Sequence, residues 1–373
     1  MGVTVAHEGW VMRPVTKQPR HAKYSPPQKL LLGGTVAALF QKIAGVRSAT
    51  PTYQIPLTLA LQVLLDHVTG LRIRRITPAE QTVLASGLMQ RISKIYKTAA
   101  LPLTDELGAF CSYCGTALPG LIEVEHALPK SHFPCYAVEW TNFLLACSPC
   151  NTCKADDPDR KTATSWAQAF SPTEQQLHNS IRQQHYIWPD LNAGCWQALP
   201  NQLQYLDPKL QTWTVLNAAE SVSAGIRLTA YDVIQHKVLA NLDASIGGGP
   251  FGDVEVAVVV SDANGRATEM IDLLGLNADS SSVFDRRLMN RTRAWFDALE
   301  ECRLLSRVDP DPKHNWLWPV TLRRAASSGF YSVWLTVMQA FDNSHGTHYA
   351  KAFVNDSASK LYYPSTNISQ LPC

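Results

Sequence analysis

The most regular recurrence of apolar residues lies in residues 77–97 and predicts an amphipathic helix. Thr77 suits the N-cap, Pro78 suits the first helical position, and Glu80 can complete a capping box. Apolar side chains then recur at helical spacing at Val83, Leu84, Leu88, Ile92 and Ile95. Another face is basic and carries Arg91, Lys94 and Lys97. Two interpretations stay open for that face, a solvated surface and a phosphate-contacting one.

Two short segments alternate with the period of a strand. Residues 121–125 read Leu-Ile-Glu-Val-Glu, which places Glu125 and His126 at the end of the first predicted strand. Residues 213–216 predict the second strand. Since a strand end holds the backbone firmly, side chains there can point into a cleft.

Helical patterns return towards the C-terminus. Residues 172–184 and 267–274 predict helices, the second closed by Gly275. Residues 283–299 predict a longer helix, and residues 329–341 form an apolar segment that suits either helix or strand. We expect four arginines on the polar side of the longer helix, with a structural, partner-facing or nucleic-acid role: Arg286, Arg287, Arg291 and Arg293.

The amino-acid composition indicates the broad class of protein. The chain has 373 residues, of which 46% are hydrophobic and 17% charged, as in ordinary globular proteins. No apolar run approaches the roughly 18 residues of a membrane-spanning helix, and the basic N-terminus has no apolar core of a signal peptide. We therefore expect a cytoplasmic protein without membrane contact. A formal net charge of +2 is too small to identify a nucleic-acid-binding protein by itself.

The patterns together predict an α+β chain in which a compact cysteine-rich module is embedded in largely helical surroundings. We expect four segments: a basic extended arm over 1–28, a helical region over 29–105, the module over 106–157, and a mixed α/β region over 158–373 that packs on the module or partners it.

The module contains two Cys-x-x-Cys pairs, a spacing typical of a tetrahedral zinc site. The expected ligands of this structural Zn²⁺ are Cys111, Cys114, Cys147 and Cys150. Five other cysteines follow no regular spacing and are interpreted as ordinary thiols: Cys135, Cys153, Cys195, Cys302 and Cys373. An alternative uses Cys135 or Cys153 as a replacement zinc ligand.

Between and beyond these pairs lie residues suited to phosphodiester hydrolysis. We expect the strand that ends at Glu125 and a helix that begins at the second cysteine pair to form a ββα arrangement. There Glu125 and Asn151 would hold a second, catalytic ion, Mg²⁺ or Mn²⁺, because oxygen ligands suit these cations. His126 is the expected general base, and Asn142 would hydrogen-bond the loop that carries it. The expected phosphate contacts are Lys130 and Lys154.

This set of residues resembles the HNH (His-Me finger) endonucleases that carry a structural zinc. The resemblance covers residues 111–156 and rests on Cys-x-x-Cys, Glu-His, Pro-Lys-Ser and Asn-Phe-Leu-Leu-Ala-Cys-x-x-Cys-Asn-x-x-Lys. It implies the zinc-stapled ββα-metal fold and catalytic roles for His126, Asn142 and Asn151. The chain departs from many members in having Asn151 where they have histidine, which is similar to zinc-bearing phage resolvases. Glu125 stands where aspartate is commoner.

Shorter motifs outside the module resemble one bacterial HNH subfamily. They are Met-Arg-Pro-Val at 12–15, Trp-Pro-Asp at 188–190, residues 271–277 followed by Arg286 and Arg291, and Gly-Phe-Tyr-Ser-Val-Trp at 329–334. Members of that subfamily occur beside ATPases in Septu and retron antiphage systems. The resemblance implies an ABC or SMC-like ATPase partner and a role in antiviral defence.

Two functions remain after this reasoning. One is a metal-dependent endonuclease that cuts DNA or RNA. The alternative is a zinc-built nucleic-acid-binding or adaptor subunit of an ATPase complex that does not cut. A transposon-type or homing nuclease ranks third, because no separate DNA-reading motif is evident in the sequence.

Overall fold

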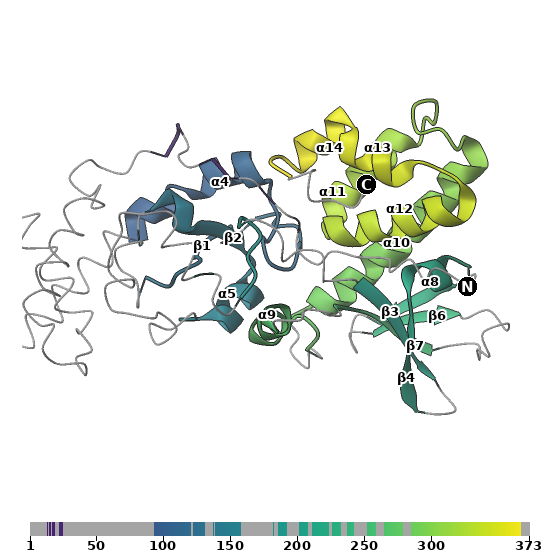
Figure 1. Ribbon diagram of the computed structural model, residues 1–373, viewed down its shortest axis with the longest axis horizontal. Coiled ribbons are helices and arrows are strands. Elements are labelled where there is room, and N and C mark those ends of the chain that lie inside the picture. Colours follow the sequence, from purple (N-terminus) through teal and green to yellow (C-terminus); the bar gives the residue numbers. More distant parts are fainter. Residues whose placement is uncertain are drawn as a thin grey trace, which may run out of the picture.

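A computed structural model of the chain shows a mixture of helices and sheets, in agreement with the predicted α+β class (Figure 1). The described residues are 13, 15, 17–18, 22–24, 93–120, 122–130, 137, 139–157, 182, 186–191, 201–207, 211–223, 226–232, 237–241, 252–258, 265–278 and 285–366. Two predicted helices lie mainly outside them. The helix expected from Thr77 is described only over 93–97, which are helical, and of 172–184 only Arg182 is described.

The cysteine-rich module contains a two-stranded antiparallel sheet with a helix packed on each of its strands. Strand β1 (Glu123–His126) pairs with β2 (Phe143–Ala146), with Glu125 opposite Leu144 and His126 opposite Phe143. Every residue of β2 is buried, which explains its continuous apolar sequence. A 3-10 turn, η3 (Trp140–Asn142), leads into β2. Helix α4 (Ala100–Leu107) packs on β2, and α5 (Ser148–Lys154) packs on β1.

Some described residues of the predicted N-terminal arm contact the rest of the chain. Val15 forms a β-bridge with Thr366 and donates its main-chain N–H to the carbonyl of Pro189. The Lys17 side chain is only 4% exposed and donates to the main-chain carbonyl of Thr141. The arm is therefore attached to both the cysteine-rich module and the C-terminal end of the chain.

The second half of the chain contains a five-stranded antiparallel sheet with the strand order β4-β3-β7-β6-β5. Its strands are β3 (Asn201–Asp207), β4 (Thr212–Leu216), β5 (Arg227–Asp232), β6 (Lys237–Asn241) and β7 (Gly252–Val258). Strand β4 confirms the strand predicted over 213–216. A short helix, α8 (Ala218–Ser223), follows β4 and packs on β3.

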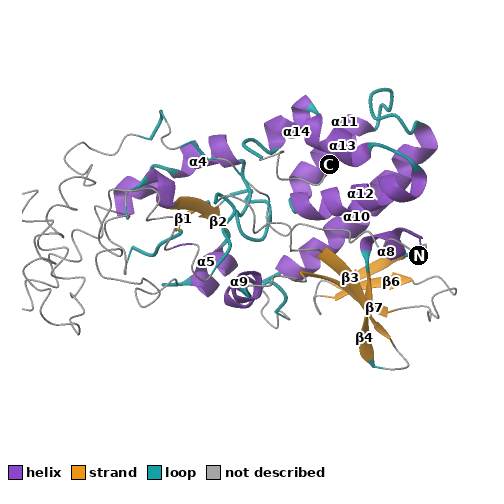
Figure 2. Ribbon diagram, in the orientation of Figure 1, coloured by secondary structure: helices purple, strands orange, loops and turns teal. Residues whose placement is uncertain are grey.

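Six further helices complete the described part of the chain (Figure 2): α9 (Arg266–Leu274), α10 (Arg287–Val308), α11 (Trp318–Ser328), α12 (Tyr331–His345), α13 (Tyr349–Asn355) and α14 (Ser357–Tyr362). Helix α9 ends at Gly275 in the left-handed region (φ 56°), as predicted. Helix α10 begins and ends later than the predicted 283–299. Helix α12 resolves the ambiguity over 329–341, and its apolar character reflects burial on nearly all sides.

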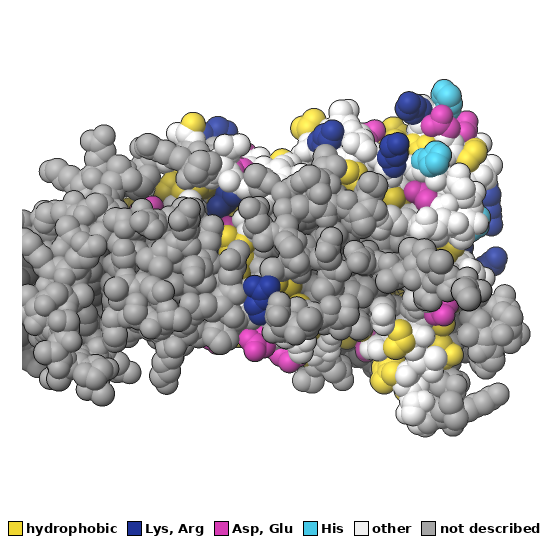
Figure 3. Space-filling view, viewed as in Figure 1, with side chains coloured by type: hydrophobic (Ala, Val, Ile, Leu, Met, Phe, Trp, Pro, Cys, Tyr) yellow, Lys and Arg dark blue, Asp and Glu magenta, His cyan; other side chains and the backbone are white. Residues whose placement is uncertain are grey.

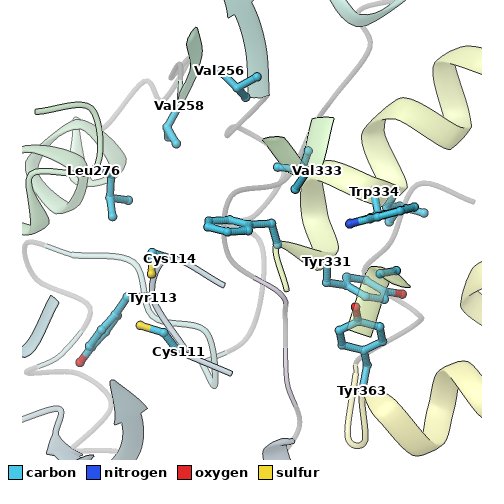
Figure 4. Packing of buried hydrophobic residues seen from close by; sticks show 14 of the residues in the cluster. Cys111, Tyr113, Cys114, Val256, Val258, Leu276, Tyr331, Val333, Trp334 and Tyr363 are labelled. Atoms are coloured by element: carbon cyan, nitrogen blue, oxygen red, sulfur yellow. The ribbon is translucent and has the colours of Figure 1, made fainter. Parts of the chain in front are cut away.

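Helix α10 lies between the sheet and the other C-terminal helices, because it contacts β7 and β6 as well as α11 and α12. On the face seen in Figure 3, lysine, arginine and histidine side chains gather at the end formed by these helices. One continuous hydrophobic core joins both halves of the molecule. Figure 4 shows this core near Cys111 and Cys114, with Leu276 on one side of them and Val333 and Trp334 on the other. None of the helices in the described ranges combines the length and apolar character needed to cross a bilayer.

Candidate metal centre and adjoining polar residues

The four cysteines of the two Cys-x-x-Cys pairs form one buried cluster. Their Sγ atoms all lie within 4.8 Å of one another, and the Sγ atoms of Cys114 and Cys147 are 3.7 Å apart. Zn–S bonds of about 2.3 Å in a tetrahedron separate sulfur atoms by about 3.8 Å. The cluster therefore has the size and the ligand type for a structural metal ion such as zinc. It is the only such group of histidine, cysteine and acidic side chains among the described residues.

Two local backbone arrangements bring the cysteines together. After Cys111 the chain turns back, so that the Gly115 N–H donates to the Cys111 carbonyl, and Gly115 takes a left-handed φ of 78°. Cys147 is the extended N-cap of α5, and the Asn151 N–H donates to its carbonyl. The Ser112 N–H donates to the Leu145 carbonyl and thereby attaches the first turn to β2. The second pair thus lies where a buried strand becomes a helix.

Arg287 connects this cluster to the C-terminal half of the molecule. Its Nη1 donates to Cys150 Sγ at 3.2 Å and to the Leu274 carbonyl at 2.7 Å, and its guanidinium also pairs with Asp285. Burial alone would lower the pKa of Arg287, but the hydrogen bond with Asp285 and the Cys150 sulfur raise it above its ordinary value. Since four thiolates around Zn²⁺ carry a net negative charge, this arginine provides a matching positive charge.

The remaining cysteines contribute nothing to the cluster where they are described. Cys153 is exposed, and Cys302 is buried in α10. Of the two alternative zinc ligands, Cys153 lies outside the four-cysteine group, while Cys135 lies outside the described residues, as do Cys195 and Cys373. The four predicted ligands are thus the ones that the structure brings together.

His126 lies at the end of β1 in an aromatic pocket and is 4% exposed. Its ring meets Tyr96 edge-on at 4.5 Å and Phe143 at 5.2 Å between centroids. Its Nε2 is 2.9 Å from the Ala137 carbonyl oxygen. Because a carbonyl only accepts, Nε2 carries the hydrogen and Nδ1 keeps a lone pair. Burial, assisted by the charge of Lys130, lowers the pKa of His126 to about 3, so the ring is neutral at pH 7.

Asn142 fastens the loop that follows His126. Its side chain is fully buried, accepts from the Leu128 N–H at 2.8 Å and donates to the Leu128 carbonyl at 2.9 Å. The main-chain carbonyl of Asn142 also accepts from the Ala127 N–H at 2.8 Å. The hydrogen bonds between this carboxamide and the loop are those that the sequence analysis expected. They fix the two residues directly after His126.

Glu125 and Asn151, the predicted ligands of a catalytic ion, each have a protein partner. The Glu125 carboxylate forms an ion pair with the Lys154 ammonium, with 2.7 Å between Oε1 and Nζ. The Asn151 Nδ2 donates to the carboxylate of Glu123. Sequence reasoning missed Glu123, although strand alternation places it on the same face as Glu125. The four side chains form two pairs that link β1 to α5.

The structure contradicts the assignment of Lys154 as a phosphate contact. Its side chain is 1% exposed and its ammonium pairs with Glu125, so it does not face a ligand in solvent. Burial lowers the pKa of Lys154 and raises that of Glu125, and each partner opposes the shift of the other. Lys130 is half-buried, with its Nζ 5.5 Å from the centre of the Tyr96 ring that contacts His126. Lys130 therefore remains close to the general-base candidate.

Two of the four arginines predicted on the polar side of this helix are buried. Arg287 is 4% exposed and Arg291 is 2% exposed. Arg291 donates to the main-chain carbonyls of Val256 and Leu276, which ties α10 to β7 and to the chain after α9. Arg286 is exposed, and Arg293 is exposed over the ring of Tyr231. For the two buried arginines, a structural role replaces the nucleic-acid alternative.

Comparison of the chain with protein-family models, with curated proteins and with solved structures gave no match.

Proposed function

We propose that this protein is a metal-dependent endonuclease of the HNH type that hydrolyses phosphodiester bonds in nucleic acid. The observation that carries the proposal is the meeting of two elements beside the four-cysteine cluster. Strand β1 ends at His126, and helix α5 starts at a cluster cysteine and directs Asn151 to β1. A general-base candidate and oxygen donors for a cation are thus held on one frame, which in this proposal is built around Zn²⁺.

His126 takes the proton of the attacking water in the proposed reaction. Its Nδ1 lone pair is available, since Nε2 donates to the Ala137 carbonyl and the ring is neutral. Asn142 acts through the Leu128 main chain, which keeps the residues after His126 in one conformation. Asn142 is therefore a positioning residue, whereas His126 acts on the reacting water.

The donors near β1 and α5 suit a hard cation. The Glu125 carboxylate already faces a positive charge. Asn151 donates a hydrogen bond from Nδ2 to Glu123, so its carboxamide oxygen would be the atom that binds a metal ion. Glu125 and Asn151 would hold Mg²⁺ or Mn²⁺. When bound, such an ion stabilises the charge that develops on the phosphate and on the leaving oxygen.

One observation favours the alternative of a non-cleaving zinc-built subunit. Glu125 is engaged by Lys154, and both Glu125 and His126 are at most 5% exposed. A protein that binds nucleic acid or an ATPase through its surface needs no access to these residues. The two functions differ in whether any phosphodiester bond is broken.

The biological setting proposed for the nuclease is antiviral defence with an ATPase partner of the ABC or SMC-like type. This part rests on the resemblance of the motifs at 12–15, 188–190 and 329–334 to HNH proteins of Septu and retron systems. In the structure the first two segments contact each other, and the third contacts the module. Val15 hydrogen-bonds Pro189, and Gly329 forms a β-bridge with Thr116.

Incubation of purified protein with plasmid, single-stranded DNA and total cellular RNA tests the proposal. Reactions contain Mg²⁺ or Mn²⁺, or neither, with and without the ATPase partner. We expect metal-dependent cleavage of at least one substrate, and its loss in Asn151→Ala at unchanged zinc content. Absence of cleavage by the wild-type protein under every condition, together with retained binding of nucleic acid or partner, would support the non-cleaving alternative.

A further inference from the structure

Between β1 and α5 lie four polar side chains that form two pairs, each joining an acidic residue of the strand to a residue of the helix. Glu123 contacts Asn151 and Glu125 contacts Lys154, so each strand residue that faces the helix has one partner there. The first pair is half-buried, whereas Lys154 and Glu125 are 1% and 5% exposed. The inner pair is therefore a buried ion pair, and the outer pair lies closer to solvent.

The Lys154 ammonium takes the position that a cation would occupy at Glu125. The Nζ and Oε1 atoms are 2.7 Å apart, so the two opposite charges are in direct contact. A divalent ion bound to the same carboxylate would lie at about 2.0–2.2 Å from an oxygen and would repel an ammonium held at this distance. The two cations therefore compete for Glu125.

The position of Lys154 allows its side chain to leave. It is the last residue of α5, and the chain departs from the helix at Ala155, which has a φ of 47° and a ψ of −121°. A change of side-chain rotamer at a helix end breaks no hydrogen bond of the helix backbone. Asp156 and Asp157 follow directly, and their charges attract the Lys154 ammonium. An alternative set of negative partners is thus adjacent in the chain.

We infer that Lys154 is an internal competitor of the catalytic metal: it holds Glu125 in the metal-free protein, and a divalent cation binds Glu125 only when Lys154 moves away. This inference rests on the proposed function, because it concerns the same site. It explains how a carboxylate with this degree of burial stays ordered and paired before a metal ion or a substrate arrives. Metal binding then requires exchange of one cation for another.

The test measures Mn²⁺ binding by electron paramagnetic resonance of the full-length, zinc-loaded protein without nucleic acid. Lys154→Met and Lys154→Gln remove the ammonium, and we expect both to bind Mn²⁺ at least tenfold more tightly than the wild-type protein. Lys154→Arg keeps a positive charge and should bind Mn²⁺ no more tightly than wild type. Lys130→Met is the matched control, since it removes a nearby charge without breaking a contact to Glu125. Its increase in Mn²⁺ affinity should be smaller than that of the Lys154 variants.

A second measurement uses the wild-type protein and does not depend on variant folding. Lys154 is labelled with an amine-reactive reagent and quantified by mass spectrometry with and without saturating Mn²⁺. We expect slow labelling without Mn²⁺ and several-fold faster labelling with it. Equal Mn²⁺ affinity of wild type and both neutral variants, or Lys154 labelling that Mn²⁺ does not change, would overturn the inference. Neither readout involves cleavage, so tighter Mn²⁺ binding by the neutral variants, together with no cleavage by the wild-type protein, would count against the nuclease and not against the competition.

Discussion

Replacement of Asn142 by alanine tests the claim that this side chain fastens the loop after His126. The substitution removes two hydrogen bonds, to the N–H and to the carbonyl of Leu128, and both residues are fully buried. Each such bond contributes about 1 kcal/mol net, and each buried group left without a partner costs about 1–3 kcal/mol. We therefore expect Asn142→Ala to reduce the free energy of unfolding by about 2–5 kcal/mol, with the lower value applying if water enters the gap.

Two assays measure this effect. Urea unfolding of the zinc-loaded protein gives the change in stability, and hydrogen exchange followed by NMR reports on the Leu128 amide itself. That amide should lose most of its protection in Asn142→Ala. Asn355→Ala is the matched control, because Asn355 is exposed and makes one hydrogen bond to the Lys351 carbonyl, so about 0.5 kcal/mol or less is expected. Unchanged Leu128 protection, or a loss of stability no larger than that of the control, would refute the reasoning.

Three further predictions concern the frame around the site. Arg287→Met should release zinc to a chelator about tenfold faster than wild type, because the Cys150 sulfur loses its charged hydrogen-bond donor. Arg286 is exposed, so Arg286→Met should release zinc at the wild-type rate, and equal release rates in the two variants would contradict this prediction. Gly329→Ala should lower the melting temperature strongly, since its Cβ would lie 2.5 Å from the Gly115 carbonyl oxygen; Gly346→Ala shares a left-handed φ but meets open space, and should lower it less. Complete removal of the metal should expose the amides of residues 111–150 to rapid hydrogen exchange while the five-stranded sheet stays protected; uniform protection would contradict a structural role for the metal.

The parts of the site that sequence predicts are those set by local spacing. Two Cys-x-x-Cys pairs identify their own metal centre, because each turn brings its two sulfur atoms together. The alternation in 121–125 locates β1, and Asn151 and Lys154 share a face of α5 since they are one helical turn apart. Gly275 marks the end of α9, because the backbone at the C-terminal cap of this helix takes left-handed φ and ψ angles, which glycine adopts without strain.

The parts that sequence reasoning misses depend on partners far apart in the chain. Nothing near Arg287 in the sequence indicates that it donates to a cysteine 137 positions away, so its helix looked like one with a polar arginine face. Lys154 was expected to contact phosphate, because periodicity gives the face of a residue but not its partner. Glu125 attracts it into the interior, where an unpaired carboxylate would be unfavourable.

The N-terminal segment illustrates the same limit. Its prolines and basic residues predict an extended arm, but they do not indicate that Lys17 contacts the carbonyl of Thr141 and the carboxylate of Asp190. A basic side chain satisfied by distant carbonyls gives no signal in its own neighbourhood. The surroundings of Lys17 in the fold, and not the composition of the N-terminal segment, determine what its side chain contacts.

In the proposed function the cysteine cluster provides the frame, and His126 takes the proton from the attacking water. The most direct test compares wild-type protein and His126→Ala for zinc content and for cleavage in the presence of Mg²⁺ on a substrate that the wild-type protein cuts. We expect the same zinc content in both proteins and a loss of cleavage of at least about a hundredfold in the variant. Cleavage at the wild-type rate by zinc-loaded His126→Ala would contradict it.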